Sequence, residues 1–264
     1  MHYKDQLKRT ITLKHTPKRI ICLVPSITEL ICDLGLESSL VGITKFCVHP
    51  KHILTIVEVV GGTKQVHYDK IRELKPDIIL CNKEENTQEM INELETISTV
   101  HISDVDTVSD CLELIEMFGE IFNCSEKAND LVVKIRKAST DFEAYISTKE
   151  TQVVAYFIWK DPWMVAANNT FVNYMLSLNN FKNAFENESR YPEISLDKIY
   201  ADVNLVLLSS EPYPFKNEHK MLIQSQFPSA EFILVDGEMF SWYGSRLVLA
   251  FDYFKTLHYT ALNS

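Results

Sequence analysis

The stretch that most constrains this fold is residues 125–146, whose spacing is that of one long amphipathic helix. Neither glycine nor proline interrupts it, and Ser125 can cap its first turn with a side-chain oxygen. Its apolar residues recur at intervals of three and four, which predicts a single buried stripe. At 1.5 Å per residue such a helix spans about 33 Å. Because similar lengths of chain flank it, we interpret it as a backbone helix that joins two lobes; the alternative is an ordinary helix on one large domain.

Both flanks of this helix alternate between strand-like and helix-like segments. Before it, strands are predicted at 19–24, 41–43, 77–81 and 99–102, and helices at 27–34, 68–74, 87–95 and 107–122. After it, strands are predicted at 152–158, 164–166, 204–208 and 231–235, and helices at 171–178, 195–200, 218–227 and 245–262. Alternation of this kind predicts parallel sheets that are covered on both faces. The predicted class is therefore α/β, with two Rossmann-like lobes joined by one long backbone helix.

The predicted division of the chain is an N-terminal lobe over 1–123, a connecting helix over 124–149 and a C-terminal lobe over 150–264. An internal echo supports two similar lobes, because residues 67–82 align without a gap on residues 195–210. Four of the sixteen aligned positions are identical, and an apolar strand follows at the same distance in both. A true duplication and a chance likeness both remain open.

Composition excludes several classes of function. The 264 residues carry a formal net charge of −10, which argues against a nucleic-acid partner and against an anionic membrane surface. No apolar run approaches the roughly 18 residues that a membrane span requires. The six cysteines are widely spaced, which argues against structural zinc. The N-terminal residues are too polar for a secretory leader. We expect either a cytoplasmic chain that starts at its native Met1, or an exported chain whose leader has been removed.

All three tryptophans are predicted to lie in loops that follow strands. Trp159 and Trp163 flank Lys160 after the strand 152–158, and Trp242 follows the strand 231–235. Ligands of open parallel sheets gather at the carboxyl ends of strands, and an indole offers a large flat apolar surface. We therefore predict that these tryptophans contact the ligand; the alternative is that each packs on its own lobe.

Further ligand contacts are predicted in both halves: Lys45, Phe46, His67, Met239, Tyr243 and Arg246. Arg246 begins the last helix, where its charge opposes the helix dipole, so we expect an acidic partner in the ligand or in the protein. His49 and His67 are candidate axial ligands for a chelated metal, or else ordinary loop histidines. Lys64 and Lys83 add positive charge, or are simply solvated.

The sequence contains none of the motifs that carry common catalytic chemistry. It lacks G-x-S-x-G, H-E-x-x-H and a phosphate-binding loop, so we predict that the protein is not an enzyme. Ser26 and Glu29 resemble a nucleophile turn, but a capping box at the start of the helix 27–34 accounts for both. Cys47 is a weak candidate for a soft metal, because no second sulfur has a matching spacing.

Three short motifs, taken together, resemble the helical-backbone substrate-binding proteins of ABC importers. They are PKRII at 17–21, PSITEL at 25–30 and LKPDII at 74–79. This family includes the vitamin B12-binding protein and the ferric-siderophore and haem receptors. The resemblance implies two rigid lobes, a metal chelate held between them and only slight closure on binding. It also implies that Asp69 and Asp197, the two aspartates of the internal echo, dock on arginines of the permease.

The sequence departs from this family at the residues that stack on the corrin of vitamin B12. The family's two tryptophan positions fall here among residues 63–65 and near Met239, while Trp242 and Tyr243 lie close enough to substitute for the second. The first hypothesis is therefore an importer's binding protein for a metal chelate, which is a corrinoid, a ferric siderophore or haem. We expect a monomer with no intrinsic cofactor.

Two other functions stay open at this point. One is a cytosolic chelate-binding or sensing module that is built on the same scaffold but is not coupled to transport; a start codon without an upstream leader would favour it. The other is an enzyme that acts on a tetrapyrrole or a small metabolite, with His49, His67 or Asp161 as acid–base groups. Loss of turnover on replacement of His67 would favour the enzyme.

Overall fold

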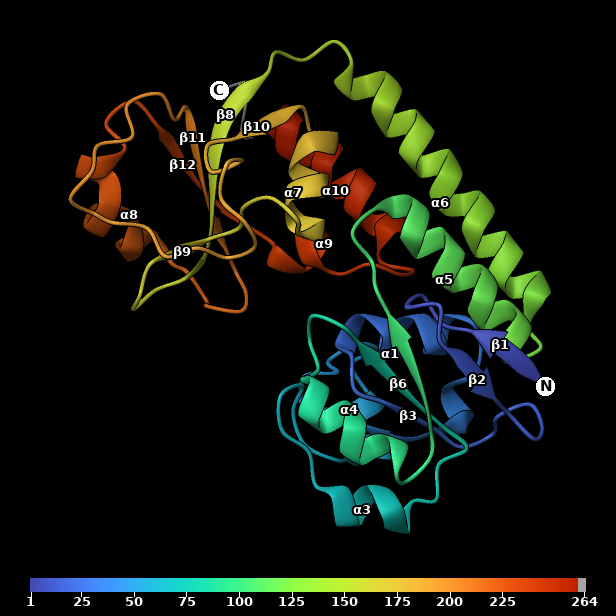
Figure 1. The fold of residues 1–264 in the computed structure, drawn as a ribbon. Helices are drawn as coiled ribbons and strands as arrows, with labels where there is room; N and C mark the ends of the chain where they lie inside the picture. The colour runs from blue at the N-terminus through green and yellow to red at the C-terminus, as the bar shows by residue number, and fades with distance from the viewer. Residues whose placement is uncertain (261–264) are drawn as a thin grey trace. The chain divides into compact units, whose positions relative to one another are not determined.

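A computed structural model describes residues 1–260 of the chain, which form two compact units (Figure 1). Unit 1 comprises Met1–Arg136 together with Trp242–Leu247, and unit 2 comprises Lys137–Ser241 together with the chain from Val248 onward. Helix α6 spans Ser125–Ile146, so it begins in unit 1 and ends in unit 2. The predicted backbone helix is confirmed at both ends.

Unit 1 is built on a five-stranded parallel sheet with the order β5-β4-β3-β6-β7. Its strands are β3 (Ile20–Cys22), β4 (Leu40–Ile43), β5 (Glu58–Val59), β6 (Ile78–Asn82) and β7 (Thr99–Ser103). The order reverses between β3 and β6, which makes these two neighbours the topological switch point of the sheet. A separate antiparallel hairpin, β1 (His2–Lys4) with β2 (Thr10–Thr12), precedes it.

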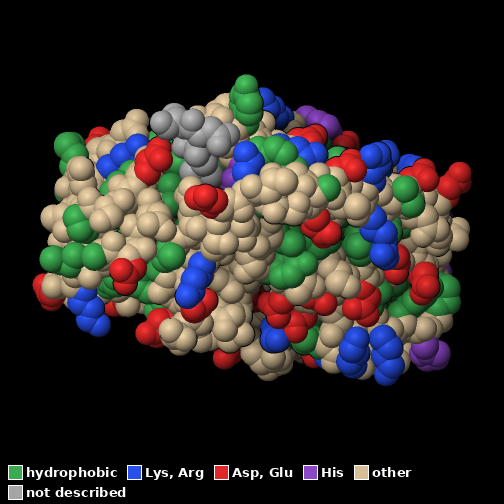
Figure 2. All heavy atoms as spheres, turned by 90° about the horizontal axis from the view of Figure 1, so that it is seen from above, with side chains coloured by type: hydrophobic (Ala, Val, Ile, Leu, Met, Phe, Trp, Pro, Cys, Tyr) green, Lys and Arg blue, Asp and Glu red, His purple; other side chains and the backbone are tan. Residues whose placement is uncertain are grey.

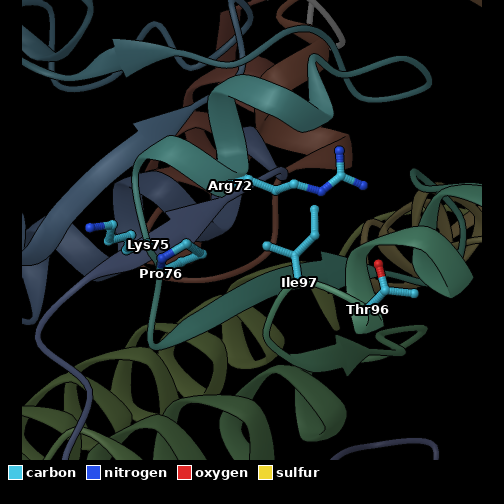
Figure 3. A pocket seen from close by; sticks show the side chains of 5 residues that line it. All are labelled: Arg72, Lys75, Pro76, Thr96 and Ile97. Carbon is cyan, nitrogen blue, oxygen red and sulfur yellow. The ribbon is translucent and has the colours of Figure 1, made fainter.

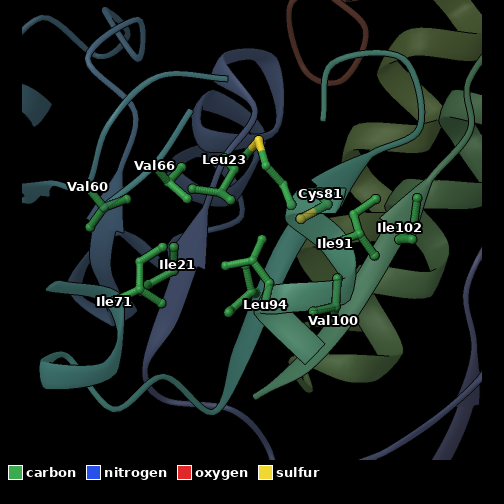
Figure 4. Packing of buried hydrophobic residues seen from close by; sticks show 12 residues of the cluster. Ile21, Leu23, Val60, Val66, Ile71, Cys81, Ile91, Leu94, Val100 and Ile102 are labelled. Carbon is green, nitrogen blue, oxygen red and sulfur yellow. The ribbon is translucent and has the colours of Figure 1, made fainter. Parts of the chain in front are cut away.

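Helices cover both faces of this sheet. They are α1 (Pro25–Asp33), α2 (Ile53–Ile56), α3 (Tyr68–Glu73), α4 (Gln88–Glu95) and α5 (Val108–Ile121). On one face, Ile71 of α3 and Leu94 of α4 pack with Ile21, Ile79 and Val100 of the strands in a single buried cluster (Figure 4). On the other face, β7 meets α5. This arrangement explains why β3 and β6 are buried throughout and are apolar except for Asn82 at the end of β6.

Unit 2 contains a second sheet with the order β10-β8-β11-β12, in which those four strands are parallel. The strands are β8 (Gln152–Trp159), β10 (Phe181–Asn183), β11 (Leu205–Ser209) and β12 (Glu231–Val235), and β9 (Met164–Val165) pairs antiparallel with β8. The helices are α7 (Phe171–Leu178), α8 (Asn217–Ile223), α9 (Gly237–Ser241) and α10 (Leu247–Thr260). The predicted α/β class with two parallel sheets is confirmed.

Aromatic side chains fill the core of unit 2. The Tyr156 and Phe240 rings lie 5.1 Å apart, the Phe240 and Phe254 rings 4.8 Å apart, and Phe142 of α6 stacks obliquely on Phe251 at 5.7 Å. Phe251 and Phe254 of α10 are fully buried. Of the predicted span 245–262, residues 261 and 262 lie outside the described residues.

Three local predictions are wrong. Ser26 does not cap α1, because Pro25 occupies the first turn, Val24 is the capping position, and no side chain caps the helix. Residues 195–200 form turns and not a helix; the Ser195 hydroxyl accepts a hydrogen bond from the Asp197 N–H at 3.1 Å. The segment predicted as a loop after β12 contains the short helix α9.

Candidate functional site

The carboxyl ends of β3 and β6 define the candidate site of unit 1. The chain leaves β3 at Cys22 and turns into α1 at Pro25, while β6 ends at Asn82 and β7 at Ser103. The Asn82 amide donates to the Ser103 hydroxyl at 3.1 Å, so the two strand ends are tied together. This edge contains the switch point, where open parallel sheets bind their ligands.

Residues 242–247, here called the return segment, pack on the same edge of unit 1. The Arg246 guanidinium donates to Glu29 of α1 from Nε at 2.8 Å and from Nη2 at 2.6 Å. Its charge also lies 4.9 Å from the centre of the Trp242 ring, and the His49 ring meets that indole edge-on at 5.4 Å. The structure therefore supplies the acidic protein partner that was one of the two alternatives for Arg246.

The rest of the return segment is held by backbone and hydroxyl contacts. The Gly244 N–H donates to the Cys111 sulfur at 3.0 Å, and the Tyr243 hydroxyl lies 3.5 Å from that of Ser103. Gly244 has φ +99°, a conformation that favours glycine. Trp242, Tyr243 and Arg246 are 7%, 6% and 5% exposed. Of the residues predicted to bind ligand, these three are thus the least accessible.

Burial dominates the electrostatics of this edge. It raises the pKa of Glu29, while the hydrogen bond and charge of Arg246 and the nearby His49 lower that pKa. It also raises the pKa of Tyr243 well above its ordinary value, against smaller opposing effects of the Ser103 and Ser26 hydroxyls. Tyr243 is therefore neutral over the physiological range.

The loop after β4 presents an exposed ring and an ammonium group. Phe46 is 49% exposed, and Lys45 Nζ lies 5.0 Å from the centre of its ring. Lys64 is exposed and donates to the Glu84 carbonyl at 2.6 Å, whereas Lys83 pairs with Asp104 at 2.7 Å. His67 is exposed at the capping position of α3. Unlike the return segment, Lys45, Phe46 and His67 are accessible to a ligand.

Cys47 sits inside this loop as a buried thiol. The hydroxyls of Thr28 and Thr44 lie 3.1 and 3.3 Å from its sulfur, and burial raises its pKa. Burial likewise raises the pKa of Cys22, Cys81 and Cys111, so these thiols stay protonated. Within residues 1–260 no cluster of three or more His, Cys, Asp or Glu side chains is arranged to hold a metal ion.

In unit 2 an aromatic group lies at the carboxyl end of β8. Trp159 is 39% exposed, and its ring meets Tyr213 edge-on at 5.7 Å. Trp163 is half-buried and stacks on Phe215 at 5.9 Å, with Lys160 Nζ 5.9 Å from its ring. Because β8 and β11 adjoin where the strand order reverses, this group occupies the switch point of the second sheet.

The three remaining predicted residues lie elsewhere on the two units. Met239 is half-buried in α9. Asp69 lies in the first turn of α3 with a side chain that is 95% exposed, and it accepts from Arg72 at 2.9 Å. Asp197 is exposed in the turn that replaces the predicted helix.

A shallow hollow lies near the amino-terminal ends of β6 and β7 in unit 1 (Figure 3). It is lined by Arg72, Lys75, Pro76, Thr96 and Ile97, none of which was predicted to bind ligand. Arg72 also forms ion pairs with Asp69 and Glu93. Since strands of the sheet begin here and end at the opposite edge, the hollow is separate from the candidate site.

Comparison with known proteins identifies the family. The model of the family described as "Periplasmic binding protein" matches residues 20–224. This chain belongs to that family. It resembles substrate-binding proteins of ABC transporters, among them those for vitamin B12, haem and iron. The periplasmic binding proteins are a binding family and not an enzyme family, which confirms the prediction of a non-enzymatic protein.

Two curated relatives illustrate the range of this family. An uncharacterized ABC transporter substrate-binding lipoprotein of Bacillus subtilis, YvrC, is 29% identical over 203 residues, which cover 74% of this chain and 64% of that relative. The vitamin B12-binding protein of Photorhabdus laumondii is 22% identical over 243 residues, which cover 90% of this chain and 87% of that relative.

Solved structures show the same fold. The periplasmic vitamin B12-binding protein BtuF of Vibrio cholerae aligns with a TM-score of 0.78 at 20% identity, over 91% of this chain and 98% of its own. The periplasmic haem-binding protein RhuT of Roseiflexus aligns with a TM-score of 0.79 at 16% identity, over 90% of this chain and 98% of its own. No helix within residues 1–260 is long and apolar enough to span a membrane.

Sequence reasoning missed two residues of this periplasmic binding protein's candidate site. Glu29 was assigned to a cap, although it is the partner of Arg246. Tyr213, which meets Trp159, was not singled out. The signal for Tyr213 was its place just after β11, at the carboxyl end of the strand next to β8. For Glu29, 217 residues away from Arg246, the sequence gives no local signal.

Proposed function

We propose that this chain is the substrate-binding protein of an ABC importer, and that its substrate is a metal chelate: a corrinoid, a ferric siderophore or haem. Membership of the periplasmic binding protein family supports the general role, and relatives whose names specify vitamin B12 or haem support the ligand class. The mechanism is reversible capture through stacking and a few charges, with no covalent chemistry and no intrinsic cofactor.

The observation that carries this proposal is that aromatic rings and an ammonium group lie together at the carboxyl edge of each sheet. In unit 1 the exposed Phe46 lies beside Lys45. In unit 2 the exposed Trp159 and the half-buried Trp163 flank Lys160, whose ammonium group lies over the Trp163 ring and pairs with Asp161. Rings provide flat apolar area for a macrocycle or an aromatic chelator, and ammonium groups complement carboxylates or phenolates. His67, Met239 and the return segment remain further proposed contacts.

The experiment is a spectroscopic titration of the purified full chain with haem, cyanocobalamin and a ferric catecholate in turn. We expect a saturable change in the absorption spectrum with one of the three, at a stoichiometry of ligand to protein that native mass spectrometry confirms. Spectra that stay unchanged with all three, together with a native mass that reveals no captured small molecule, would remove the proposed ligand class.

We further propose that Asp69 and Asp197 dock the protein on the permease, and that it acts as a monomer outside the cytoplasmic membrane. Both carboxylates are exposed, and charge at a rim accelerates encounter and fixes register more than it adds affinity. The relatives support this location, because their names describe periplasmic proteins or a lipoprotein. The alternative is a chelate-binding or sensing module that is not coupled to transport.

A further inference from the structure

We propose that unit 1 contains a binding site for one small monovalent anion at the amino end of α1. The donors are the N–H groups of Ser26 and Ile27 and the hydroxyls of Ser26 and Ser245. The ligand is a halide or a single carboxylate group. This site does not depend on which chelate the protein carries, and it lies at the switch point between β3 and β6.

The first step concerns the hydrogen bonding of the N–H groups at the amino end of α1. Pro25 starts the nine-residue helix α1, and the first intrahelical bond runs from the Thr28 N–H to the Val24 carbonyl at 2.9 Å. The N–H groups of Ser26 and Ile27 precede that bond and so have no partner within the helix, and no side chain caps it. Such a terminus carries about half a positive charge and attracts anions.

The second step is independent of the helix. The Ser26 and Ser245 hydroxyls are buried, and neither has a hydrogen-bond partner in the described part of the chain. These residues are only 4% and 8% exposed. Buried hydroxyls in folded proteins almost always have a partner, so two orphans on one sheet edge indicate a missing acceptor. The Ser26 hydroxyl also lies close enough to Tyr243 to lower the pKa of that phenol.

The return segment brings these groups into one small region. Gly244 packs so closely on α1 that a Cβ atom at this position would lie 3.4 Å from the Ser26 carbonyl oxygen and 3.3 Å from the Leu30 Cβ. Ser245 follows directly in the chain. Two backbone and two side-chain donors are therefore supplied by the start of α1 and by a segment that is packed on it.

Charge limits what the site accepts. Glu29 lies on the same helix and would repel an anion. Arg246 donates a hydrogen bond to each of its carboxylate oxygens, however, so the two charges balance. Glu85 acts on the neighbouring Tyr243 and adds negative charge to this edge. A divalent anion would meet that repulsion in a buried place, whereas a monovalent one is balanced by the helix terminus.

The experiment measures thermal unfolding of the full chain in sodium bromide and in sodium gluconate at equal ionic strength, since gluconate is too large to enter. Bromide is expected to raise the midpoint saturably by about 2–4 °C. Ser26→Ala and Ser245→Ala should each lose at least half of this shift, and the double variant should lose it all. In gluconate the variants should be as stable as the parent, because each removes an unsatisfied hydroxyl. Ser225→Ala, at an exposed serine, is the matched control.

Crystals soaked in bromide give a second measurement, with an anomalous peak expected within hydrogen-bond distance of both serine hydroxyls. Sodium formate distinguishes the sources of the anion: a saturable shift shows that a carboxylate group is accepted, and a response to bromide alone assigns the site to a free halide. A bromide shift of equal size in the parent and in the double variant would overturn the proposal, as would a water without anomalous signal between the serines.

Discussion

Arg246 and Glu29, which are 217 positions apart in the chain, form a buried bidentate ion pair. The side chain of Arg246 is 5% exposed and that of Glu29 is 14% exposed. The pair fastens the return segment to α1, and the same guanidinium supports the face of Trp242 at 4.9 Å. A single ion pair thereby fixes the position of one of the three predicted tryptophan contacts.

Replacement of Arg246 by methionine should destabilise the protein by about 2–4 kcal/mol, because Glu29 would remain buried without its partner. The measurement is urea unfolding followed by tryptophan fluorescence. In the double variant Glu29→Met with Arg246→Met, much of the loss should be recovered, since no charge stays buried. Lys137→Met breaks an exposed pair with Asp141 and serves as the control, with no measurable change expected. Equal effects of Arg246→Met and Lys137→Met would contradict this interpretation.

The structure explains why this pair was only half predictable. The position of Arg246 at the start of a helix indicated that it needs an acidic partner, and that inference is confirmed. Its partner could not be named, because the capping box expected at Ser26 and Glu29 assigned that carboxylate to a local role. Pro25 explains the difference. Because it lacks an N–H, it suits the first position of a helix, and α1 begins there, two residues earlier than predicted. Glu29 is then not needed for capping and reaches the return segment.

Because the His101 imidazole is buried, we expect the protein to lose stability in acid. Its side chain is fully buried on β7, packs on Phe118 at 5.1 Å and has no hydrogen-bond partner on either ring nitrogen in residues 1–260. Burial lowers its pKa to about 4. The unfolded chain binds a proton near pH 6.5, whereas the folded chain binds it only near pH 4. The free energy of unfolding is therefore highest above pH 6.5 and falls as the pH drops towards 4, by up to about 3 kcal/mol.

Urea unfolding at pH 7 and at pH 4.5 checks this prediction. His101→Leu should lose less stability between these two conditions than the parent does. His258 contributes in the same direction, because burial lowers its pKa to about 4 as well, so the double variant should depend least on pH. His15→Leu, at an exposed histidine, is the comparison variant. An unaltered pH dependence in the His101→Leu variant would show that this histidine is not the group responsible.

Trp159 and Trp163 should respond differently to substitution. Trp159→Ala removes an exposed ring and should weaken chelate binding about 5- to 50-fold with little change in stability. Trp163→Ala removes a ring that stacks on Phe215 and packs on Phe157, so it should lower the unfolding midpoint as well. Fluorescence or absorbance titration with the chelate identified above measures the first effect, and Met221→Ala, at a residue 75% exposed, is the control. Unchanged affinity in Trp159→Ala would remove this residue from the site.

Periodicity predicted most of the elements, because burial on one face leaves a regular pattern in the sequence. The stripe of α6 and the apolar run of β6 are examples, and both lie where they were expected. Short elements were missed where tertiary contacts outweigh local preference. Residues 195–200 repeat the pattern of α3 but form turns, and the Tyr200 N–H bonds to the Gln226 carbonyl at 2.7 Å instead of continuing a helix. A prediction from one stretch of sequence cannot include that contact.

Charge reversal tests the proposed docking residues. Asp69→Lys and Asp197→Lys should each reduce stimulation of the permease ATPase by the loaded binding protein about tenfold, while chelate affinity stays constant. Glu73→Lys on α3 is the matched control for Asp69, because it changes the same charge on the same helix. Full stimulation by both aspartate variants would favour the module that is not coupled to transport.

Gly244→Ala tests how tightly the return segment is fitted. Two effects oppose an alanine here: φ of +99° is unfavourable for any residue with a Cβ atom, and that atom would press on Leu30 at 3.3 Å. The expected loss is about 1–3 kcal/mol in urea unfolding, with weaker protection of the Trp242 indole against acrylamide quenching.

Gly62→Ala is the control, because its φ lies outside the unfavourable range and its nearest neighbour is the movable ring of Phe46. It should be neutral or slightly stabilising, since alanine restricts the unfolded chain. If both alanines were tolerated equally, the return segment would have room to shift, and the close packing of Gly244 on α1 that supports the proposed anion site would not be required.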